Sequence, residues 1–412
     1  MKSSSRRRAS EKASALAARS RRAIELHQQG RLADAERLYR QILAAMPTHF
    51  DSLHLLRVIK GQQNDFAAAV PFFEQALRVN PESASAFSNF GNVLQALGRY
   101  NGALASFDRS LALRPDNPKA LMHRGDALRK LSRPDEALAS YDRALLLQPG
   151  YADALVHRGG VLIDLGRHEE AVAAFRTALA SGGDEQRIRY SLACLGVEPV
   201  PKASPAEYVR GLFDQYADAF DQHLVEDLEY KTPTFLVDAL RTLVAPTAGP
   251  LDVLDLGCGT GLCGSMLRPL ARTLVGVDLS PKMLAKARER GGYDELVCAD
   301  VAAYLGGQPQ RFDVGLSADV FVYIGDLSDV FAGMRQVLRP GGLFGFSVEA
   351  GDGTDFILQP THRFAHSAGY LRRLAAAQGF AIESLESRVI RTNRGIGVSG
   401  YLVVMRREHQ DR

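Results

Sequence analysis

Small and aromatic residues recur in the first half of the chain at a fixed interval of 34 residues. Each alanine of the pattern precedes an aromatic residue by four positions, so the two lie one turn apart on the same face of a helix. Proline keeps the same step and ends each stretch. The columns are Ala35, Ala69, Ala103, Ala137 and Ala171; Tyr39, Phe73, Phe107, Tyr141 and Phe175; and Pro47, Pro81, Pro115 and Pro149. The pattern predicts helix pairs that begin near Leu16, Phe50, Ala84, Pro118 and Ala152.

These columns resemble the tetratricopeptide repeat, a helix-turn-helix unit that stacks into arrays. Alanine lets two helix backbones approach, and the aromatic ring fills the adjoining space. The resemblance implies an all-α solenoid of about five repeats over residues 16–197, with Arg187 to Leu195 as a capping helix. Arg57 stands in the slot that holds Gly91, Gly125 and Gly159 in later units, so we expect looser packing in the early repeats.

Arrays of this kind bind proteins in a concave groove, which the sixth position of each first helix faces. That column reads Arg21, Leu55, Asn89, His123 and His157, and Asn92 and Asp126 follow on the same surface. Asn and His side chains hydrogen-bond an extended peptide backbone irrespective of its sequence, so we predict a protein or peptide partner there. The alternative is that these are ordinary solvated positions.

The helical repeat stops at a proline-rich stretch, residues 198–206, which we interpret as a linker. A helical segment follows from residue 207, in which Phe213, Tyr216, Phe220 and Leu224 recur at helical spacing and are predicted to be core. Apolar runs of strand length then alternate with helix-like stretches. The runs are residues 251–256, 273–277, 296–299, 312–316 and 343–348. Residues 207–412 are therefore predicted to form a parallel sheet covered by helices, with a ligand at the carboxyl ends of the strands.

Composition places the chain among globular proteins, with 412 residues, 46% hydrophobic residues and a formal net charge of +3. That charge is too small to indicate a nucleic-acid binder, and we predict a disordered basic tail at residues 1–15; a mitochondrial transit peptide is a minor alternative. No apolar run of about eighteen residues and no secretory signal is found, so no membrane span is expected. Four cysteines without staple or zinc-like spacing favour a reducing compartment, the cytoplasm, and no metal site.

The first predicted strand runs into VLDLGCGTG, residues 253 to 261, and the second ends in GVDLS with Asp278. Glycines let backbone amides approach a ligand, and a carboxylate one strand away can accept both hydroxyl hydrogens of a ribose. With CAD ending at Asp300 and LRPGG at residues 338 to 342, the segment resembles the class I methyltransferases that use S-adenosylmethionine. The resemblance implies that the donor is bound by Asp255, Gly257, Gly259, Gly261, Asp278 and Asp300.

The rival interpretation of this loop is a nicotinamide or flavin Rossmann domain. Its pattern requires Gly or Ala where Leu262 stands, and the tighter spacing of the three glycines favours the methyl donor. From FDQYADAFDQHL at residue 213 to GYLVVMRR at residue 400, the chain also resembles a bacterial group of predicted methyltransferases with tetratricopeptide repeats. That resemblance implies a Rossmann-like sheet of seven strands, with an antiparallel pair at residues 381–391 and 400–406.

Polar residues near the ends of strands four and five are candidates for the acceptor site. Asp319, Tyr323 and Glu349 are three of these. We favour His362, Arg363 and His366 as catalytic residues, because two imidazoles and a guanidinium suit an anionic acceptor and its proton. The alternative is a surface helix cap.

The sequence therefore predicts an S-adenosylmethionine-dependent methyltransferase whose repeats recruit a protein or a carrier-bound acceptor. A methyltransferase of a small carboxylate or hydroxyl metabolite, with repeats used for localisation, is the alternative, and a mainly scaffolding protein is another. DNA is disfavoured as an acceptor. Strand four is followed by Ser317-Ala-Asp319-Val rather than an Asn-Pro-Pro-Tyr-like loop, and the chain has no Pro-Cys pair.

Overall fold

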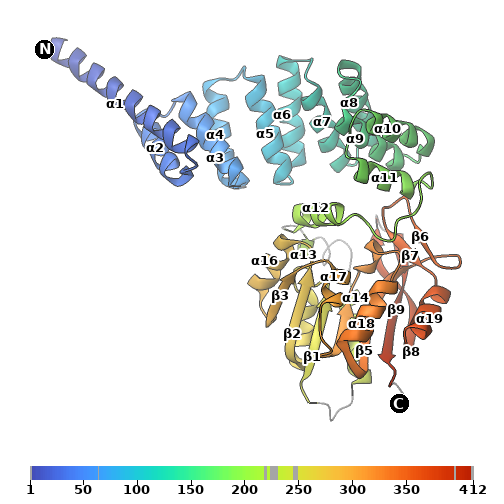
Figure 1. Cartoon of the computed structure of the whole chain (residues 1–412). Helices are drawn as coiled ribbons and strands as arrows, with labels where there is room; N and C mark the ends of the chain where they lie inside the picture. The colour runs from blue at the N-terminus through green and yellow to red at the C-terminus, as the bar shows by residue number, and fades with distance from the viewer. Residues whose placement is uncertain are drawn as a thin grey trace. The chain divides into compact units, whose positions relative to one another are not determined.

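A computed structural model describes residues 2–63, 65–217, 220–222, 231–244, 249–393 and 396–409 (Figure 1). Contacts divide the chain into two compact units, residues 1–183 and 184–412. We call them the repeat unit and the sheet unit. Leu224, predicted to be a core residue, lies outside the described residues.

The repeat unit consists of paired helices. Its helices are α1 (Lys2–Gln28), α2 (Leu32–Ala45), α3 (Phe50–Gln62), α4 (Phe66–Val79), α5 (Ala84–Ala96), α6 (Tyr100–Leu113), α7 (Pro118–Lys130), α8 (Pro134–Leu147), α9 (Ala152–Asp164) and α10 (His168–Ala180). The predicted starts at Phe50, Ala84, Pro118 and Ala152 are confirmed. The disordered tail predicted at residues 1–15 is instead helical from Lys2, in a segment without Gly or Pro that is rich in Ala, Arg and Lys.

The repeating columns form the core of this unit. All five alanines are fully buried, and the five aromatic residues are at most 3% exposed. A Cβ atom on Gly91 would lie 2.6 Å from Cε1 of Phe107, so the aromatic ring packs directly on the glycine backbone. In the second repeat Arg57 fills this slot, and its guanidinium carbon lies 5.1 Å from the ring centroid of Phe73. A cation-π contact there replaces the contact of ring and glycine.

The sheet unit alternates helices and strands. Its elements are α11 (Glu185–Cys194), α12 (Ala206–Tyr216), α13 (Phe220–Gln222), α14 (Thr232–Leu243), β1 (Leu251–Leu256), α15 (Leu262–Leu267), η2 (Arg268–Leu270), β2 (Ala271–Asp278), α16 (Pro281–Arg290), β3 (Glu295–Cys298), α17 (Val301–Gly306), β4 (Phe312–Ser317), η3 (Phe321–Tyr323), α18 (Ser328–Val337), β5 (Leu338–Ala350), β6 (Phe356–Leu358), β7 (Phe364–His366), α19 (Ala368–Ala377), β8 (Phe380–Asn393) and β9 (Ile396–Arg407).

The strands form one mostly parallel sheet in the order β3-β2-β1-β4-β5-β7-β6. Strand β9 pairs antiparallel with β5, and β8 pairs antiparallel with β9, as the sequence predicts for the last two strands. Among the described residues the sheet has nine strands, whereas seven were expected. The two additional strands are β6 and β7, which form a short antiparallel hairpin. Three-residue strands show no usable hydrophobic period, so the sequence pattern does not predict them.

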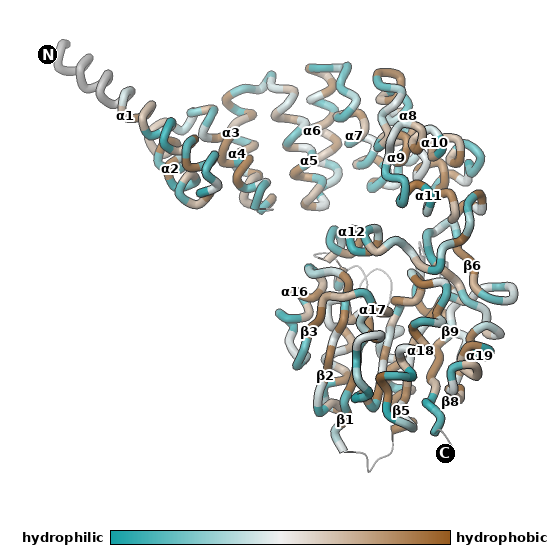
Figure 2. Tube along the Cα trace, viewed as in Figure 1, coloured by the Kyte–Doolittle hydropathy of each residue, from teal (hydrophilic) through white to brown (hydrophobic). Residues whose placement is uncertain are grey.

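Hydrophobic side chains of the strands face helices on both sides of this sheet. Leu254 and Phe344 belong to a cluster with α17, α18 and α19. Val253 and Leu343, their neighbours in sequence, belong to a second cluster with α14 and α15. Figure 2 shows hydrophobic residues along the central strands. This two-sided burial explains why the strands are near-continuous apolar runs.

The boundary between the units differs from the predicted one. Helix α11, expected to cap the repeats, groups with the sheet unit. The stretch 198–206, expected to be a linker, forms backbone hydrogen bonds with residues 323–326 of the sheet unit. The carbonyl oxygen of Lys202 accepts hydrogen bonds from Gly325 and Asp326, and the amide of Ser204 donates to the carbonyl of Tyr323 at 2.8 Å. Prolines interrupt a helix but leave extended backbone free to form such bonds, so the sheet unit begins at residue 184.

Candidate active site

The loop after β1 is built from three glycines in the left-handed backbone region. Gly257, Gly259 and Gly261 have φ values of +69°, +55° and +86°, which residues with a Cβ rarely adopt. A Cβ on Gly257 would lie 2.1 Å from Cγ2 of Val320. On Gly259 it would meet only Cε1 of Phe220, at 3.8 Å. The loop therefore leaves a backbone surface that a ligand can approach closely.

Asp278, at the end of β2, lies beside this loop. Its Oδ2 accepts a hydrogen bond from the amide of Gly259 at 2.9 Å, and its Oδ1 accepts one from the amide of Ser280 at 2.8 Å. Burial raises the pKa of the Asp278 carboxyl. Each carboxylate oxygen retains a lone pair for a further donor, such as a hydroxyl group. The position fits a ribose next to a glycine loop.

Asp255 is directed to a different partner. The hydroxyl of Tyr293 donates a 2.6 Å hydrogen bond to its Oδ2, and burial raises the pKa of Asp255 to about 7. The Tyr293 ring lies 3.1 Å from the position of a Cβ on Gly261. Asp255 thus supports the glycine loop through Tyr293. Both Asp255 and Asp278 therefore have hydrogen-bond partners within the protein.

Asp300 follows β3 and caps the next helix. Its Oδ1 accepts a hydrogen bond from the amide of Ala303 at 3.1 Å, the usual geometry of an N-cap residue. The residue is exposed. It stands at the same carboxyl edge of the sheet as the glycine loop and Asp278, since β1, β2 and β3 are adjacent and parallel.

Helices α12 and α13 lie over the glycine loop. Asp221 pairs with Arg290 and accepts a hydrogen bond from the hydroxyl of Thr260. The ring of Phe213 lies 6.0 Å from that of Phe220 and 5.5 Å from that of Tyr323. No residue of α12 is buried, so the prediction that these aromatics are core is wrong. Phe213, Tyr216 and Phe220 are half-buried instead, and Phe220 contacts the rings of the other two beside the loop.

A second group of polar residues lies at the ends of β4 and β5 and on β8. Glu349, 3% exposed, pairs with Arg391, and its Oε1 lies 3.6 Å from Nη1 of Arg363. The guanidinium carbon of Arg363 lies 5.9 Å from the ring centroid of Tyr323. Burial raises the pKa of Asp319, and the charges of Arg391 and Arg363 lower it in part. We call these five residues the ionic cluster.

Asp319 connects the ionic cluster to the glycine loop. It has a φ of +58°, and its amide donates to the hydroxyl of Ser347 at 2.8 Å. That hydroxyl donates in turn to Oδ1 of Asp319. Val320, the next residue, is the side chain that a Cβ on Gly257 would touch. A non-glycine residue held in this region is strained, which is common at functional sites.

The three residues predicted to be catalytic have separate surroundings. Arg363 reaches the ionic cluster. His366 is fully buried on β7, its Nε2 donates to the carbonyl of Gly325 at 3.0 Å, and burial lowers its pKa to about 4. His362 lies in the β6–β7 turn, where its Nε2 is 3.3 Å from Oγ of Ser191. The alternative of a helix cap does not hold, since Ser367 caps α19.

Arg391 was missed by sequence reasoning. It lies in a strand beside Ile390, and both side chains are buried. Strict alternation would place one of them in solvent, but the pairing of β8 and β9 shifts register between Val389 and Arg391. Such a bulge changes the face of the sheet toward which a side chain points. Strand β8 also carries Glu383, Glu386 and Arg388, so a further charged residue gave no distinct signal in the sequence.

The predicted groove residues of the repeat unit are partly engaged with one another. Asp126 accepts a 2.7 Å hydrogen bond from the hydroxyl of Tyr141, pairs with His157, and lies 3.5 Å from Nδ1 of His123. Burial acts to raise the pKa of Asp126, but the bonds to His123 and His157 hold it well below the ordinary value. Asn89 is exposed. Asp126 therefore has a structural role between repeats.

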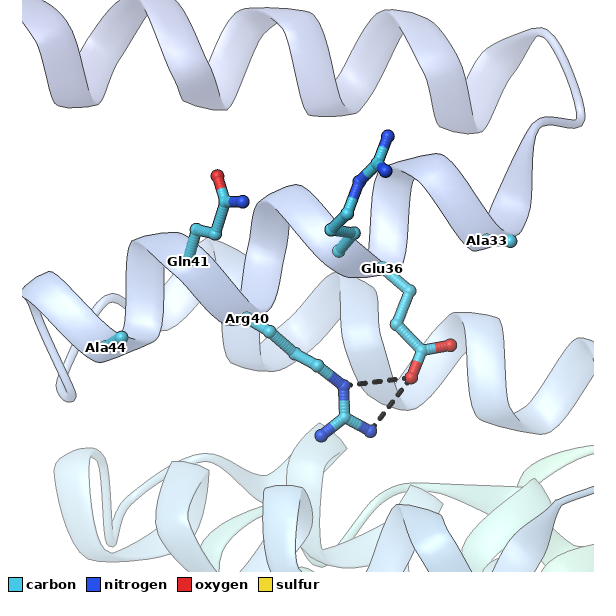
Figure 3. A pocket seen from close by; sticks show the side chains of 6 residues that line it. Ala33, Glu36, Arg40, Gln41 and Ala44 are labelled. Carbon is cyan, nitrogen blue, oxygen red and sulfur yellow. Dashed lines mark hydrogen bonds and ion pairs between the residues drawn. The ribbon is translucent and has the colours of Figure 1, made fainter.

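A surface hollow of about 480 Å³ lies along α2 of the repeat unit (Figure 3). Its lining residues are Ala33, Glu36, Arg37, Arg40, Gln41 and Ala44. Glu36 accepts hydrogen bonds from Arg40 at 2.9 Å and from Lys60 at 2.8 Å. The lining comes from one helix and includes none of the predicted site residues, so we assign it no chemistry.

Comparison with protein families identifies both parts of the chain. Residues 254–346 match the methyltransferase domain family. Three overlapping segments, residues 59–118, 88–145 and 122–186, match the tetratricopeptide repeat family. The chain therefore joins tetratricopeptide repeats, which suggest protein binding, to a methyltransferase domain of the class that uses S-adenosylmethionine. The glycine loop and Asp278 fit that cofactor.

Several proteins similar to this chain are named as methyltransferases. The chain is 28% identical over 209 residues to the ubiquinone biosynthesis O-methyltransferase of Thiobacillus denitrificans, covering 44% of this chain and 89% of the relative. It is 30% identical over 139 residues to the malonyl-[acyl-carrier protein] O-methyltransferase of Salmonella typhimurium, covering 34% and 52%. Several other relatives are matched over about half of their length or less.

Among solved structures, an S-adenosylmethionine-dependent methyltransferase from Mesorhizobium loti shares 27% identity over 41% of this chain and 96% of its own, with a TM-score of 0.33. In the described part of the chain, no helix has both the length and the apolar character needed to cross a membrane.

Proposed function

We propose that this chain transfers the methyl group of S-adenosylmethionine to an acceptor that belongs to, or is carried by, a protein bound by its repeats. The observation that carries the proposal is the junction at Val320. The glycine loop touches that side chain, and the strained Asp319 of the ionic cluster precedes it directly. A donor site and a polar site thus adjoin at the carboxyl edge of the sheet, where ligands of such sheets bind.

The donor half of the proposal assigns a role to each predicted residue. The backbone of Gly257, Gly259 and Gly261 receives the donor closely, and the carboxylate of Asp278 accepts the ribose hydroxyls. Asp300 contacts the adenine. Asp255 acts indirectly, since it holds Tyr293 against the loop.

The aromatic residues above the loop exclude water from the donor. Phe220 lies over Gly259, and Phe213 contacts both Phe220 and Tyr323 of the ionic cluster. Methyl transfer from a sulfonium is a displacement on an already activated carbon, so positioning of the nucleophile and exclusion of water are the main tasks of the protein.

Of the three residues predicted to be catalytic, we propose that Arg363 alone contacts the methyl acceptor. His362 and His366 are assigned to positioning, because the first pairs with α11 and the second is buried and neutral. Asp319 and Glu349 are the carboxylates available as a base if the acceptor is a neutral hydroxyl. No base is needed for an acceptor that is already a carboxylate.

The repeats provide the protein-binding half of the proposal. Exposed Asn89 and the half-buried Asn92, His123 and His157 offer hydrogen bonds to an extended peptide. Asp126 holds the two histidines in place. The name of the malonyl-[acyl-carrier protein] O-methyltransferase describes a carrier-bound acceptor, which supports this assignment.

A second candidate is a small-metabolite O-methyltransferase whose repeats serve for localisation. This candidate is favoured by the similarity to the ubiquinone biosynthesis O-methyltransferase, because the match covers 89% of the length of that relative. The same sheet unit would serve both functions, so the acceptor alone distinguishes them.

The experiment compares the full chain with residues 184–412 in extracts of the source cells, using S-adenosylmethionine labelled in its methyl group. The proposal expects label in the protein fraction, and less of it when the repeats are absent. Label confined to small molecules would favour the second candidate. Donor binding without any label would indicate a scaffolding protein. Asp278→Asn in the full chain is the control for donor-dependent labelling.

A further inference from the structure

The ionic cluster contains two guanidinium groups, a buried one of Arg391 and a half-buried one of Arg363, and the carboxylate of Glu349 contacts both. Arg391 is 8% exposed, and one of its nitrogens pairs with Glu349. Its other terminal nitrogen, Nη1, has no hydrogen-bond partner among the residues that the structure describes. Arg363 lies 3.6 Å from the same carboxylate oxygen, which is longer than a hydrogen bond.

Hydrogen-bond donors exceed acceptors in this cluster. A guanidinium carries five N–H donors, whereas the side chain of Glu349 supplies two oxygens. Asp319 already accepts a hydrogen bond at its Oδ1, from the hydroxyl of Ser347. A buried donor left without an acceptor costs about 1 to 3 kcal/mol. The cluster is therefore incomplete by at least one acceptor group.

We propose that Arg363 and Arg391 form a subsite for a carboxylate of the methyl acceptor, beside the resident carboxylate of Glu349. The inference rests on the proposed function and names the chemical class of its acceptor. Glu349 satisfies only part of the donors of these two guanidinium groups, and a further carboxylate would supply an acceptor for Nη1 of Arg391. The planar fork of arginine matches the two oxygens of a carboxylate.

The subsite anchors the acceptor rather than activating it. The guanidinium of Arg363 lies over the ring of Tyr323, which fixes its orientation. Hydrogen bonds from two cations withdraw electron density from the oxygens that they hold, so these oxygens are poor nucleophiles. The anchored carboxylate places another part of the acceptor toward the glycine loop, which lies against Val320, the neighbour of Asp319.

The test uses butyrate as a probe, with butyramide as its uncharged counterpart and inorganic phosphate as a competing anion. Saturation-transfer NMR at constant ionic strength measures binding to the full chain, with and without S-adenosylhomocysteine. We expect saturable binding of butyrate, little binding of butyramide, and weaker competition by phosphate. Arg363→Gln and Arg391→Gln should each weaken butyrate binding about tenfold or more, the loss expected of a charged hydrogen bond.

Arg388→Gln is the matched control, because Arg388 lies on the same strand with a side chain that is 46% exposed. Equal binding of butyrate and butyramide to the wild-type chain would overturn the subsite, and so would unchanged binding in both Arg363→Gln and Arg391→Gln. Stronger competition by phosphate would overturn the choice of a carboxylate. If Arg391→Gln does not fold, the butyrate affinity of Arg363→Gln alone tests the subsite. The side chain of Arg363 is 32% exposed, so its replacement should leave the fold intact.

Failure of the subsite and failure of the proposed function have different signatures. Calorimetry with S-adenosylmethionine measures donor binding separately from the butyrate titration. A chain that binds butyrate through the two arginines but no donor would contradict the methyltransferase proposal alone. A chain that binds the donor but no butyrate contradicts the subsite alone.

Discussion

The hydroxyl of Tyr190 donates a 2.9 Å hydrogen bond to the backbone carbonyl oxygen of His362. Tyr190 lies on α11, which follows the repeats, and His362 precedes Arg363 of the ionic cluster. His362 has a φ of +63°, a conformation that a residue with a Cβ adopts only when its surroundings enforce it. Helix α11 thus helps to hold the turn that carries an acceptor-site arginine.

Removal of the Tyr190 hydroxyl should loosen this turn. Tyr190→Phe deletes the bond to His362 and a 2.7 Å bond with Ser204, so the free energy of unfolding of residues 184–412 should fall by about 1 to 3 kcal/mol. Chemical denaturation followed by circular dichroism measures it. Tyr208→Phe is the control, because the ring of Tyr208 lies 5.4 Å from that of Tyr190 and no bond from its hydroxyl is found among the described residues. Equal stability of the two variants would contradict the role of Tyr190.

Loss of the Asp278 charge should weaken donor binding. Asp278→Asn keeps the shape of the side chain but replaces one acceptor oxygen with an amino group and removes the charge that strengthens bonds to ribose hydroxyls. We expect a loss of about 1.5 to 3 kcal/mol, roughly a 10- to 100-fold weaker Kd for S-adenosylmethionine in calorimetry. Asp238→Asn, on the exposed face of α14, should bind as the wild type does. Unchanged affinity in Asp278→Asn would remove this residue from the donor site.

A methyl group on Gly91 should destabilise the repeats. The added Cβ would lie 2.6 Å from the buried Phe107 ring, so Gly91→Ala should lower the unfolding free energy by about 1 to 3 kcal/mol. Gly61→Ala serves as the control, because nothing lies within 4 Å of its Cβ position. Alanine favours a helix over glycine, so this control should gain about 0.5 to 1 kcal/mol. Thermal unfolding of both variants distinguishes ring packing from helix propensity.

The stability of the sheet unit should depend on pH through Asp255. Its pKa in the folded protein is raised to about 7 by burial, against about 3.9 in an unfolded chain, so folding favours the protonated carboxyl. The benefit is complete below pH 4 and is lost as the pH rises through 7. Asp255→Asn cannot ionise, so between pH 4 and pH 7 it should gain stability relative to the wild type, by about a few kcal/mol. Denaturation across this pH range measures it, and parallel curves for the two proteins would contradict the raised pKa.

The repeats were predictable from the sequence because their packing recurs. A contact such as that of Gly91 with Phe107 returns in the next two units, as Gly125 with Tyr141 and Gly159 with Phe175, so one interval in the sequence reveals many contacts in space. The glycine loop was predictable for a related reason. Its positive φ values are a property of a few consecutive residues, and glycine is the residue that adopts them at low cost.

The partners of the functional side chains were decided by the tertiary structure. Asp255 meets Tyr293, and Tyr190 meets His362, across sequence separations of 38 and 172 residues. Arg391 reaches Glu349 because a shift in the register of β8 and β9 turns it inward. No local pattern encodes a contact that depends on which strands pair and at what register. The sequence by itself therefore determined the repeats, the alternating sheet and the glycine loop, whereas the pairing of distant strands and helices decided which charged groups meet beside that loop.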